Sequence, residues 1–402
     1  MKPKLLVVPH LCAESITIRE IELARRLVEF FDVYSPKWSD ALHIDGGPPY
    51  QRRWRQFRTA LQSLLTRSHH SRGADGITYL EVPVLQPMLL RRAVGGRLAL
   101  SLSELFNRRV LDKIISSLGI RCVLLAADSF GLPRTPGVRV FFDLVDWFPE
   151  EKSSPRHLAF VRRRLRKIAG RVQGLFAVSE PLCQKLKAEL GIDAIPLPNG
   201  ADLEALRSVD PEEVATVRSQ WRLQGKFVIG YVGNHGSFTG VDFVVKVFQA
   251  VCQRIPNAAL LIVGPADYWS PILSAVRSQG VTCTGPIAPS KIAPYFNAID
   301  LGVLAQEKSL GTEFAFQIKN VEYTACRKFV VSTPLRTWER LRWPNIFLAE
   351  RDVETWVAAI CKARDARWLP EWDRLTEPYD WKVLAGNVAR ILAGSELVET
   401  KS

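Results

Sequence analysis

The stretch from residue 301 to residue 333, LGVLAQEKSLGTEFAFQIKNVEYTACRKFVVST, constrains the fold of this chain more than any other. Residues 301–305 form an apolar run of the length of a buried strand, and residues 329–331 begin a second one. Between them lie a polar loop and residues 318–325, whose apolar positions at spacings of three and four predict a short helix. This order predicts a parallel βαβ unit, and the loop that enters its helix is where open α/β sheets hold anions and nucleotides.

Two charged residues of the predicted helix, Lys319 and Glu322, lie three positions apart and therefore share one helix face. A cation and a carboxylate in this place suit a phosphate and a ribose diol. The segment from Lys319, KNVEYTACRKFVVST, resembles the K-x-x-E-Y-x-A-x-G-K-P-V-V-x-S segment of GT-B-fold, nucleotide-sugar-dependent glycosyltransferases. It is most similar to the retaining family-four group that builds bacterial polysaccharides.

The resemblance implies that Glu322 binds the ribose hydroxyls of the donor. Three positions depart from the family pattern: Arg327 and Phe329 stand where the family has glycine and proline, and Thr333 stands where it has serine. The first glutamate of the family falls on Phe314, one step from Glu313, which is therefore our candidate for that carboxylate.

A chain of 402 residues is too long for one ordinary core, so two domains are expected. The resemblance implies an α/β fold with two Rossmann-like, doubly wound domains that face a cleft. Residues 1–200 are then an acceptor-binding domain, with a C-terminal helix in 379–402 that packs back on it. Residues 205–378 are the donor-binding domain.

A glycine turn follows the strand predicted over residues 226–232, and a helix is predicted from near Val241. Such a turn lets backbone N–H groups approach a diphosphate. It resembles the family's G-x-x-G-x-x-x-x-x-K-G-V-D, but Asn234 and Thr239 stand where many members carry arginine and lysine. Neutralising the phosphates is therefore assigned to Lys319, with Lys308 as the alternative. The predicted donor site is Gly233, Asn234, Gly264, Gly285, Ile287, Lys319 and Glu322.

Polar residues also follow predicted strands in the first half. Asp143 and Asp146 stand at the end of a strand predicted over residues 138–144 and resemble the D-x-x-D of the polysaccharide group. Two roles stay open for Asp146, one as base or acceptor-orienting group and one in capping and solvation of the loop. His10 and Glu14, after the first predicted strand, are acceptor-side candidates, with a structural role as the alternative for His10. The candidate catalytic residues are Asp146, Lys319 and Glu313.

The formal net charge of +13 suits an anionic partner. Two segments, 51–72 and 156–171, are rich in arginine and contain no acidic residue. Their apolar residues recur at roughly helical spacing, as in basic helices that lie on anionic membranes. The alternative is a solvated helix whose apolar stripe faces the core. The first segment lies in residues 36–76, where we expect an irregular insertion, and neither segment carries a module that reads nucleic acid.

The seven cysteines are scattered without a C-x-x-C pair, which favours a reducing compartment. The first apolar run, LLVVPHL, is too short for a signal peptide and predicts a strand. We therefore expect a cytoplasmic protein, and the basic segments add the expectation of association with a membrane surface. No D-x-D motif follows a strand in the second half, so neither a metal nor another cofactor is expected beside the donor.

Together these features predict a glycosyltransferase that moves a sugar from a nucleotide diphosphate sugar to a polysaccharide or lipid-linked acceptor. The resemblance implies bacterial cell-surface glycan synthesis with retention of configuration. Three alternatives stay open: an inverting enzyme with Asp146 as base, an enzyme of other chemistry on the same fold such as a sugar-nucleotide epimerase, and a non-catalytic binding or scaffold protein.

Overall fold

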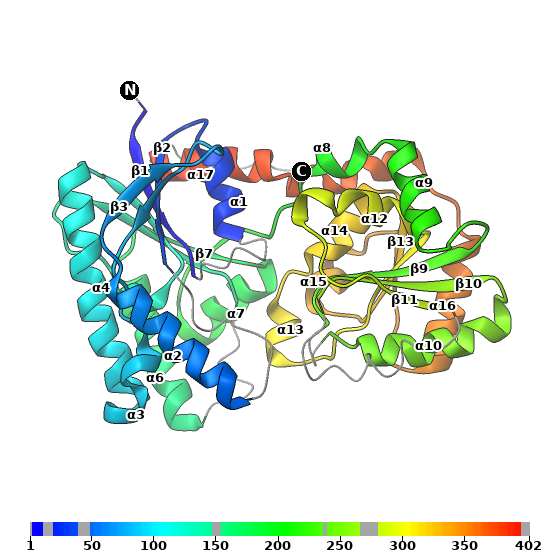
Figure 1. Ribbon diagram of the computed structural model, residues 1–402, viewed down its shortest axis with the longest axis horizontal. Helices are drawn as coiled ribbons and strands as arrows, with labels where there is room; N and C mark the ends of the chain where they lie inside the picture. Colours follow the sequence, from blue (N-terminus) through cyan, green and yellow to red (C-terminus); the bar gives the residue numbers. More distant parts are fainter. Residues whose placement is uncertain are drawn as a thin grey trace. The chain divides into compact units, whose positions relative to one another are not determined.

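The computed structural model describes residues 2–10, 19–38, 49–146, 154–235, 239–265 and 280–394. These residues form two compact units, each built on its own sheet (Figure 1). The first unit contains the described residues up to 146, those from 154 to 197 and those from Trp381 onward. The second is Pro198–Asp380. The fold is therefore α/β with two sheet-based units.

The sheet of the first unit has the strand order β3-β4-β2-β1-β5-β6-β7-β8. Every neighbouring pair is parallel except β3 and β4. Strand order reverses direction between β1 and β5, which is where such sheets place their ligands. The strands are β1 (Lys4–Val8), β2 (Asp32–Lys37), β3 (His69–Arg72), β4 (Thr78–Glu81), β5 (Cys122–Leu125), β6 (Arg139–Leu144), β7 (Gly174–Ala177) and β8 (Ile195–Pro196).

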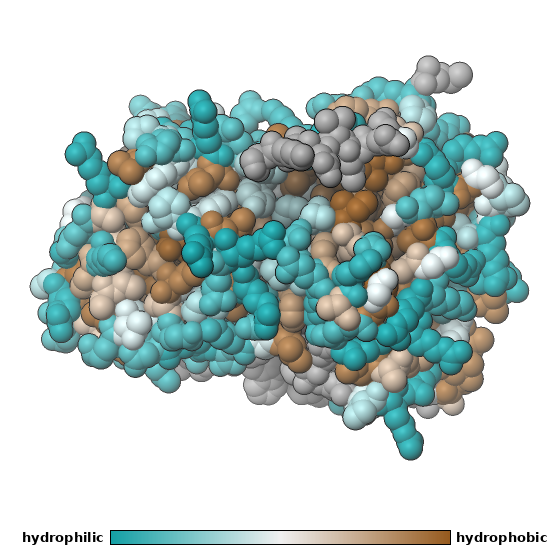
Figure 2. Space-filling model, turned by 180° about the vertical axis from the view of Figure 1, so that it is seen from behind, coloured by the Kyte–Doolittle hydropathy of each residue, from teal (hydrophilic) through white to brown (hydrophobic). Residues whose placement is uncertain are grey.

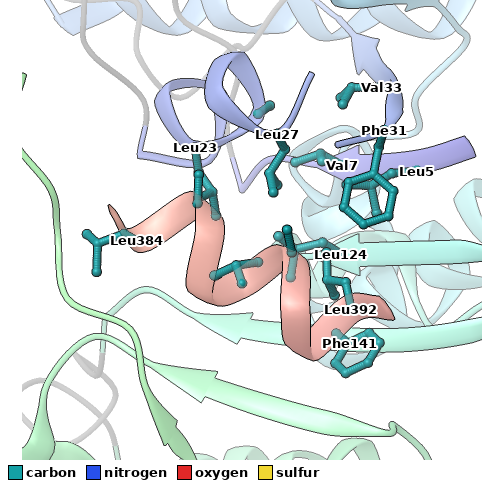
Figure 3. Close-up of a cluster of buried hydrophobic side chains, with 14 of the residues drawn as sticks. Leu5, Val7, Leu23, Leu27, Phe31, Val33, Leu124, Phe141, Leu384 and Leu392 are labelled. Carbon is teal, nitrogen blue, oxygen red and sulfur yellow. The ribbon is translucent and has the colours of Figure 1, made fainter. Parts of the chain in front are cut away.

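The helices of this unit include one from the far end of the chain. They are α1 (Arg19–Leu27), α2 (Pro49–Leu65), α3 (Pro87–Val94), α4 (Gly96–Leu118), α6 (Pro155–Ala169), α7 (Glu180–Leu190) and α17 (Trp381–Ala393), with a 3-10 turn, η1, over Asp128–Phe130. Helix α17 packs against α1. Its Leu384 and Leu392 join a core made by α1, β1, β5 and β6 (Figure 3). Burial of each such side chain stabilises the unit by about 1.5–3 kcal/mol.

The expectation of an irregular insertion over residues 36–76 is wrong for its described part. Helix α2 begins with Pro49, a residue suited to a first helical turn, and contains no glycine. Strand β3 then pairs antiparallel with β4 through a turn that contains Gly73 and Gly76, and Gly76 has the positive φ of 80° that such turns favour. The roughly helical spacing within residues 51–72 agrees with α2, whereas β3 was not predicted.

The second unit has a parallel sheet of order β11-β10-β9-β12-β13-β14, in which direction reverses between β9 and β12. Its strands are β9 (Phe227–Val232), β10 (Ala258–Val263), β11 (Val281–Cys283), β12 (Leu301–Leu304), β13 (Phe329–Ser332) and β14 (Ile346–Leu348). Its helices are α8 (Leu203–Arg207), α9 (Pro211–Gln220), α10 (Val241–Arg254), α12 (Ala293–Ala298), α13 (Leu310–Phe314), α14 (Ile318–Ala325), α15 (Arg336–Leu341) and α16 (Val353–Asp365), with 3-10 segments η2 (Pro289–Lys291) and η3 (Pro370–Tyr379).

The βαβ unit predicted from residues 301–333 is present as β12, α14 and β13, which is parallel to β12. The polar loop contains one further short helix, α13, whose first turn is capped by the Ser309 side chain. On the face seen in Figure 2 the surface is mainly hydrophilic, and hydrophobic residues form separate patches.

Candidate functional site

In the second unit the strand order reverses between β9 and β12, and Tyr323 lies where these two strands separate. Strands β9 and β12 pair over only two residue pairs. Beyond them the Tyr323 hydroxyl of α14 donates to the Gly230 carbonyl at 3.0 Å and accepts from the Val232 N–H at 2.9 Å. The ring lies on Gly302, where a Cβ atom would overlap it. Tyr323 therefore takes the place of sheet hydrogen bonds where the strands separate.

Glycines bring the backbone of several strand ends close together. Gly233, Gly240, Gly264 and Gly285 have φ angles of 154°, 71°, 131° and 71°, which other residues rarely adopt. A Cβ atom on Gly264 would overlap the Gly233 carbonyl oxygen, and one on Gly240 would overlap the carbonyl oxygen of Ala305. At these places the edge of the sheet presents backbone without side chains, and an anion can approach peptide groups closely there.

Helix α10 starts directly after Gly240, which has no side chain that could cap the first turn. Its N–H groups and the positive end of its dipole therefore face the loop that follows β9. In that loop Asn234 is exposed, and its carbonyl accepts a 2.7 Å hydrogen bond from the Tyr231 hydroxyl. On the other side, Gly285 accepts from the Gly264 N–H at 3.1 Å, and Ile287 is half-buried.

Lys319 and Glu322 form an ion pair on α14. Lys319 Nζ lies 2.6 Å from Glu322 Oε2, and their side chains are 30% and 17% exposed. The lysine ammonium also lies 5.3 Å from the centre of the Phe296 ring, within the range of a cation–π contact. Both side chains are partly exposed, although Oε2, the Glu322 oxygen that faces the ammonium, is itself buried. A ligand with hydroxyls and phosphates therefore meets an acceptor and a cation side by side.

The other charged residues predicted near this site have different partners. Lys308 Nζ lies 2.6 Å from Glu350 Oε1. Glu313 accepts from Arg336 Nε at 2.9 Å. Arg336 was missed in the sequence, although a cation four positions beyond a buried strand is a signal for this edge of the sheet. It adds a guanidinium to the charges at the strand ends.

In the first unit, the carboxylate at the end of β6 is paired within the protein. Asp143 accepts from Arg19 Nε and Nη2, both at 3.0 Å, in a two-pronged geometry. Arg19 Nη2 also donates to the Leu197 carbonyl at 2.6 Å. Both side chains are buried. Arg19 was missed because nothing in the sequence near it indicates a partner more than a hundred residues away.

His10 and Glu20 form a second pair beside it. His10 Nδ1 lies 2.6 Å from Glu20 Oε1, and the His10 backbone N–H donates to the same oxygen at 3.1 Å. Burial alone would lower the pKa of His10, but the hydrogen bond and charge of Glu20 outweigh it, and the pKa is raised. Burial would likewise raise the pKa of Glu20, and His10 lowers it instead. Glu14 lies outside the described residues.

Asp146 stands two residues beyond β6 and is exposed. The protein around it nevertheless removes enough water to raise its pKa to about 6. The positive charges of His10 and Arg19 oppose this shift, and the carboxylates of Glu20 and Asp143 add to it. Asp146 is thus half-ionised near pH 6 and mostly ionised at neutral pH, as suits a proton acceptor.

Neither a metal cluster nor a spanning helix is found in the part of the chain that the structure describes. No three or more of its histidines, cysteines, aspartates and glutamates are placed to bind one metal ion. None of its helices is both long and apolar enough to cross a bilayer.

Comparison with known proteins finds similarity to glycosyltransferases in sequence over part of the chain and in fold over almost all of it. Residues 226–365 match the family described as "Glycosyl transferases group 1". A segment of 130 residues is 29% identical to the putative teichuronic acid biosynthesis glycosyltransferase TuaH of Bacillus subtilis (strain 168). That match covers 31% of this chain and about a third of the relative's length, 32%.

Solved structures agree over almost the whole chain. A glycosyltransferase from Rickettsia africae has a TM-score of 0.68 at 13% identity, covering 98% of this chain and 100% of that one. Anabaena HepE in complex with UDP and glucose has a TM-score of 0.65 at 14% identity, with the same coverage. Sucrose-phosphate synthase from Thermosynechococcus elongatus gives 0.67 at 14% identity, again over 98% and 100%. At such identities these likenesses show the fold, and the predicted resemblance to GT-B glycosyltransferases is confirmed.

Proposed function

We propose that this chain is a glycosyltransferase that transfers a sugar from a nucleotide diphosphate sugar to a glycan or lipid-linked acceptor in bacterial cell-surface polysaccharide synthesis. One observation carries the proposal. The match to group 1 glycosyl transferases, residues 226–365, falls on the unit whose strand ends combine glycine-lined backbone with the Lys319–Glu322 pair. The relative named for teichuronic acid biosynthesis supports the polysaccharide part.

The donor is proposed to bind at the strand ends of the second unit. Glu322 accepts hydrogen bonds from the ribose hydroxyls. These bonds weaken the ion pair between Glu322 Oε2 and Lys319 Nζ, which lie 2.6 Å apart in the structure. The lysine charge then becomes available to the diphosphate, together with N–H groups from the first turn of α10. Departure of the diphosphate builds negative charge on its bridging oxygen, and these donors stabilise that charge.

The acceptor is proposed to bind the first unit, at His10 and Asp146. The resemblance implies retention of configuration. The alternative is inversion with Asp146 as base, and its pKa of about 6 suits that role. The two are distinguished by the anomeric configuration of the product, read by NMR from the coupling constant of the anomeric proton.

A rival function of another class is a binding or scaffold protein without catalysis. The motif departure at Asn234 and Thr239, which lack the family's cations, favours it. Nucleotide binding without transfer would indicate this function. Product formation from the donor alone, without any acceptor, would indicate the other rival, a sugar-nucleotide epimerase.

The decisive experiment is a thermal-shift panel of nucleoside diphosphates, starting with UDP, which is bound in the Anabaena HepE structure. Glu322→Ala tests the ribose contact, and Glu339→Ala on α15, which is exposed, is the matched control. A ligand that binds only the folded state stabilises it by about 2.7 kcal/mol at a hundredfold excess over Kd.

We expect one nucleotide to stabilise the wild type and the control but not Glu322→Ala. Transfer of sugar from that nucleotide's sugar conjugate to a lipid or glycan acceptor completes the test. If no nucleotide stabilises the wild type, the donor site is wrongly placed and the glycosyltransferase proposal fails with it.

A peripheral contact with an anionic membrane surface forms the second part of the proposal, and α2 supports it. Four large apolar residues of α2 are exposed along one face, at spacings of three and four: Trp54, Phe57, Leu61 and Leu65. Trp54 and Leu65 are 66% and 70% exposed. The apolar stripe of α2 therefore does not face the core, and exposed arginines, among them Arg53 and Arg58, lie beside it.

Helix α6 is the matched control for α2, because its Leu165 is buried while Arg156, Arg163 and Lys167 are exposed, as in an ordinary surface helix. The test replaces Arg52, Arg53, Arg55 and Arg58 by glutamine. The control replaces Arg156, Arg163, Lys167 and Arg171 in the same way. We expect the first variant alone to lose binding to phosphatidylglycerol vesicles and activity on a lipid acceptor. Equal loss in both would indicate attraction by net charge without a contact through α2.

A further inference from the structure

The contact between His10 and Glu20 has the geometry of a proton-accepting dyad. The carboxylate oxygen Oε1 lies 2.6 Å from His10 Nδ1 and also accepts the His10 backbone N–H at 3.1 Å. Two bonds to one oxygen fix the imidazole in position. Glu20 is fully buried, while the His10 side chain is 34% exposed. The ring thus joins a buried carboxylate to a face that solvent and ligands can reach.

The carboxylate also selects the imidazole tautomer. Because Oε1 only accepts, Nδ1 carries the hydrogen, and in the neutral ring Nε2 keeps its lone pair. The second oxygen of Glu20, Oε2, is buried and has no hydrogen-bond partner among the described residues. A buried carboxylate with an unpartnered oxygen gains from a nearby positive charge, so it favours the imidazolium that forms when Nε2 takes up a proton.

Resting on the proposed glycosyl transfer, we infer that His10, oriented by Glu20, takes the proton of the acceptor hydroxyl. In this step the acceptor O–H bond breaks and its proton moves to Nε2. The acceptor oxygen forms a bond with the anomeric carbon, and the bond from that carbon to the diphosphate breaks, with its electron pair leaving on the nucleoside diphosphate. The imidazolium later returns its proton to solvent, so the balance is the same for retention and inversion.

Asp146 is the competing base, and the two differ in how they are held. No hydrogen bond to the Asp146 side chain is found within the described ranges, whereas two bonds join His10 to Glu20. The charges that face His10 are Glu20, Asp143, Asp146 and Arg19. The three carboxylates raise the pKa of His10, which strengthens it as a proton acceptor near neutral pH.

The test measures acceptor-dependent transfer as a function of pH for the wild type, His10→Gln and Glu20→Gln. His70→Gln, on the exposed strand β3, is the control. We expect His10→Gln to lower kcat by about 10²–10⁴-fold, with the donor Kd unchanged by calorimetry. In the wild type kcat/KM falls at low pH as His10 becomes protonated. In Glu20→Gln the fall of kcat/KM shifts to lower pH, because Glu20 raises the pKa of His10.

Two other outcomes overturn the inference. A wild-type acid limb that persists in His10→Gln assigns the base to another group, of which Asp146→Asn is the direct test. If the fall of kcat/KM at low pH occurs at the same pH in Glu20→Gln as in the wild type, Glu20 does not set the pKa of the proton-accepting group. Loss of folding in His10→Gln, seen as loss of donor binding, is checked with His10→Asn, and kcat must fall there too. Absence of transfer by the wild type is a different failure, since it removes the proposed function itself.

Discussion

The strand ends of the two units hold their charges in opposite ways. In the first unit the charged groups are interior: Arg19, Glu20 and Asp143 are all buried. In the second unit they form pairs near the surface, as Lys319 does with Glu322 and Arg336 with Glu313, whose members are 17–55% exposed. The second unit places neutral glycine backbone, instead of charge, at its closest contacts.

This difference indicates that the first unit has a fixed arrangement of charges before a substrate binds, whereas the ion pairs of the second unit can separate when one binds. Buried ions are held by partners that they cannot leave without a large desolvation cost, so the first unit fixes its geometry before anything binds. Exposed ion pairs are worth about 0–1 kcal/mol, so an anionic ligand can separate them easily. Under the proposed function, the first unit orients an acceptor hydroxyl and the second accepts a diphosphate.

The largest expected effect comes from breaking the buried pair of the first unit. Arg19→Met leaves Asp143 buried without its cation and also removes the bond to the Leu197 carbonyl. We expect the free energy of unfolding to fall by about 3–5 kcal/mol, measured by urea denaturation. The control is Arg336→Met, which removes the exposed partner of Glu313 and is expected to cost about 1 kcal/mol or less. If both variants lost a similar free energy of unfolding, the charges of the two units would not differ in how strongly they are held.

The second prediction concerns the buried hydroxyl of Tyr323, which bridges the Gly230 carbonyl and the Val232 N–H in the second unit. Tyr323→Phe removes the hydroxyl and leaves the Gly230 carbonyl and the Val232 N–H without this partner in a buried place. We expect a loss of about 1–3 kcal/mol in unfolding free energy. Tyr295→Phe is the matched control, because Tyr295 is buried and no hydrogen bond of its hydroxyl is found in the described part of the chain. An unchanged stability of Tyr323→Phe would mean that solvent reaches this gap.

A third, smaller effect depends on pH. The pKa of His10 is raised above 6.5, so its contribution to stability is present below pH 6.5 and is lost as pH rises through the folded-state pKa. The pKa of Glu20 is lowered below 4.5, so its contribution is present above pH 4.5 and is lost as pH falls through the folded-state pKa. The stability difference between wild type and Glu20→Gln should therefore be greatest between about pH 4.5 and 6.5. A difference independent of pH would show that the two groups do not titrate together.

Much of the second unit could be predicted from the sequence, because its signals are local. Apolar runs and helical spacing predicted β12, α14 and β13, and the pair of Lys319 with Glu322 follows from their spacing on one helix. The first unit was predicted less well. Arg19 meets Asp143 and the Leu197 carbonyl only because the sheet brings distant segments together, and no periodicity reports such a contact. Glu20 was also missed, although its partner His10 lies only ten residues before it.

The departures from the family motif are explained only by the tertiary structure. Arg327 and Phe329 both contact a segment that the motif does not contain. Arg327 Nε and Nη2 bind the two carboxylate oxygens of Asp373 at 3.0 and 2.6 Å. Phe329 packs its ring edge-on against Trp368 and Trp372. The two substitutions thus share one partner region, residues 368–373.

The smallest predicted effect tests whether the family's glycine is still favoured at position 327. Arg327 has a φ of 55°, a left-handed conformation that costs a side-chain-bearing residue about 1–2 kcal/mol. Its exposed pair with Asp373 recovers about 0–1 kcal/mol. Arg327→Ala keeps the strain and loses the pair, whereas Arg327→Gly loses both. We therefore expect the glycine variant to be about 1 kcal/mol more stable than the alanine variant by urea denaturation. If alanine is equal or better, the turn between α14 and β13 relaxes when Asp373 is released, and the surface pair determines its conformation.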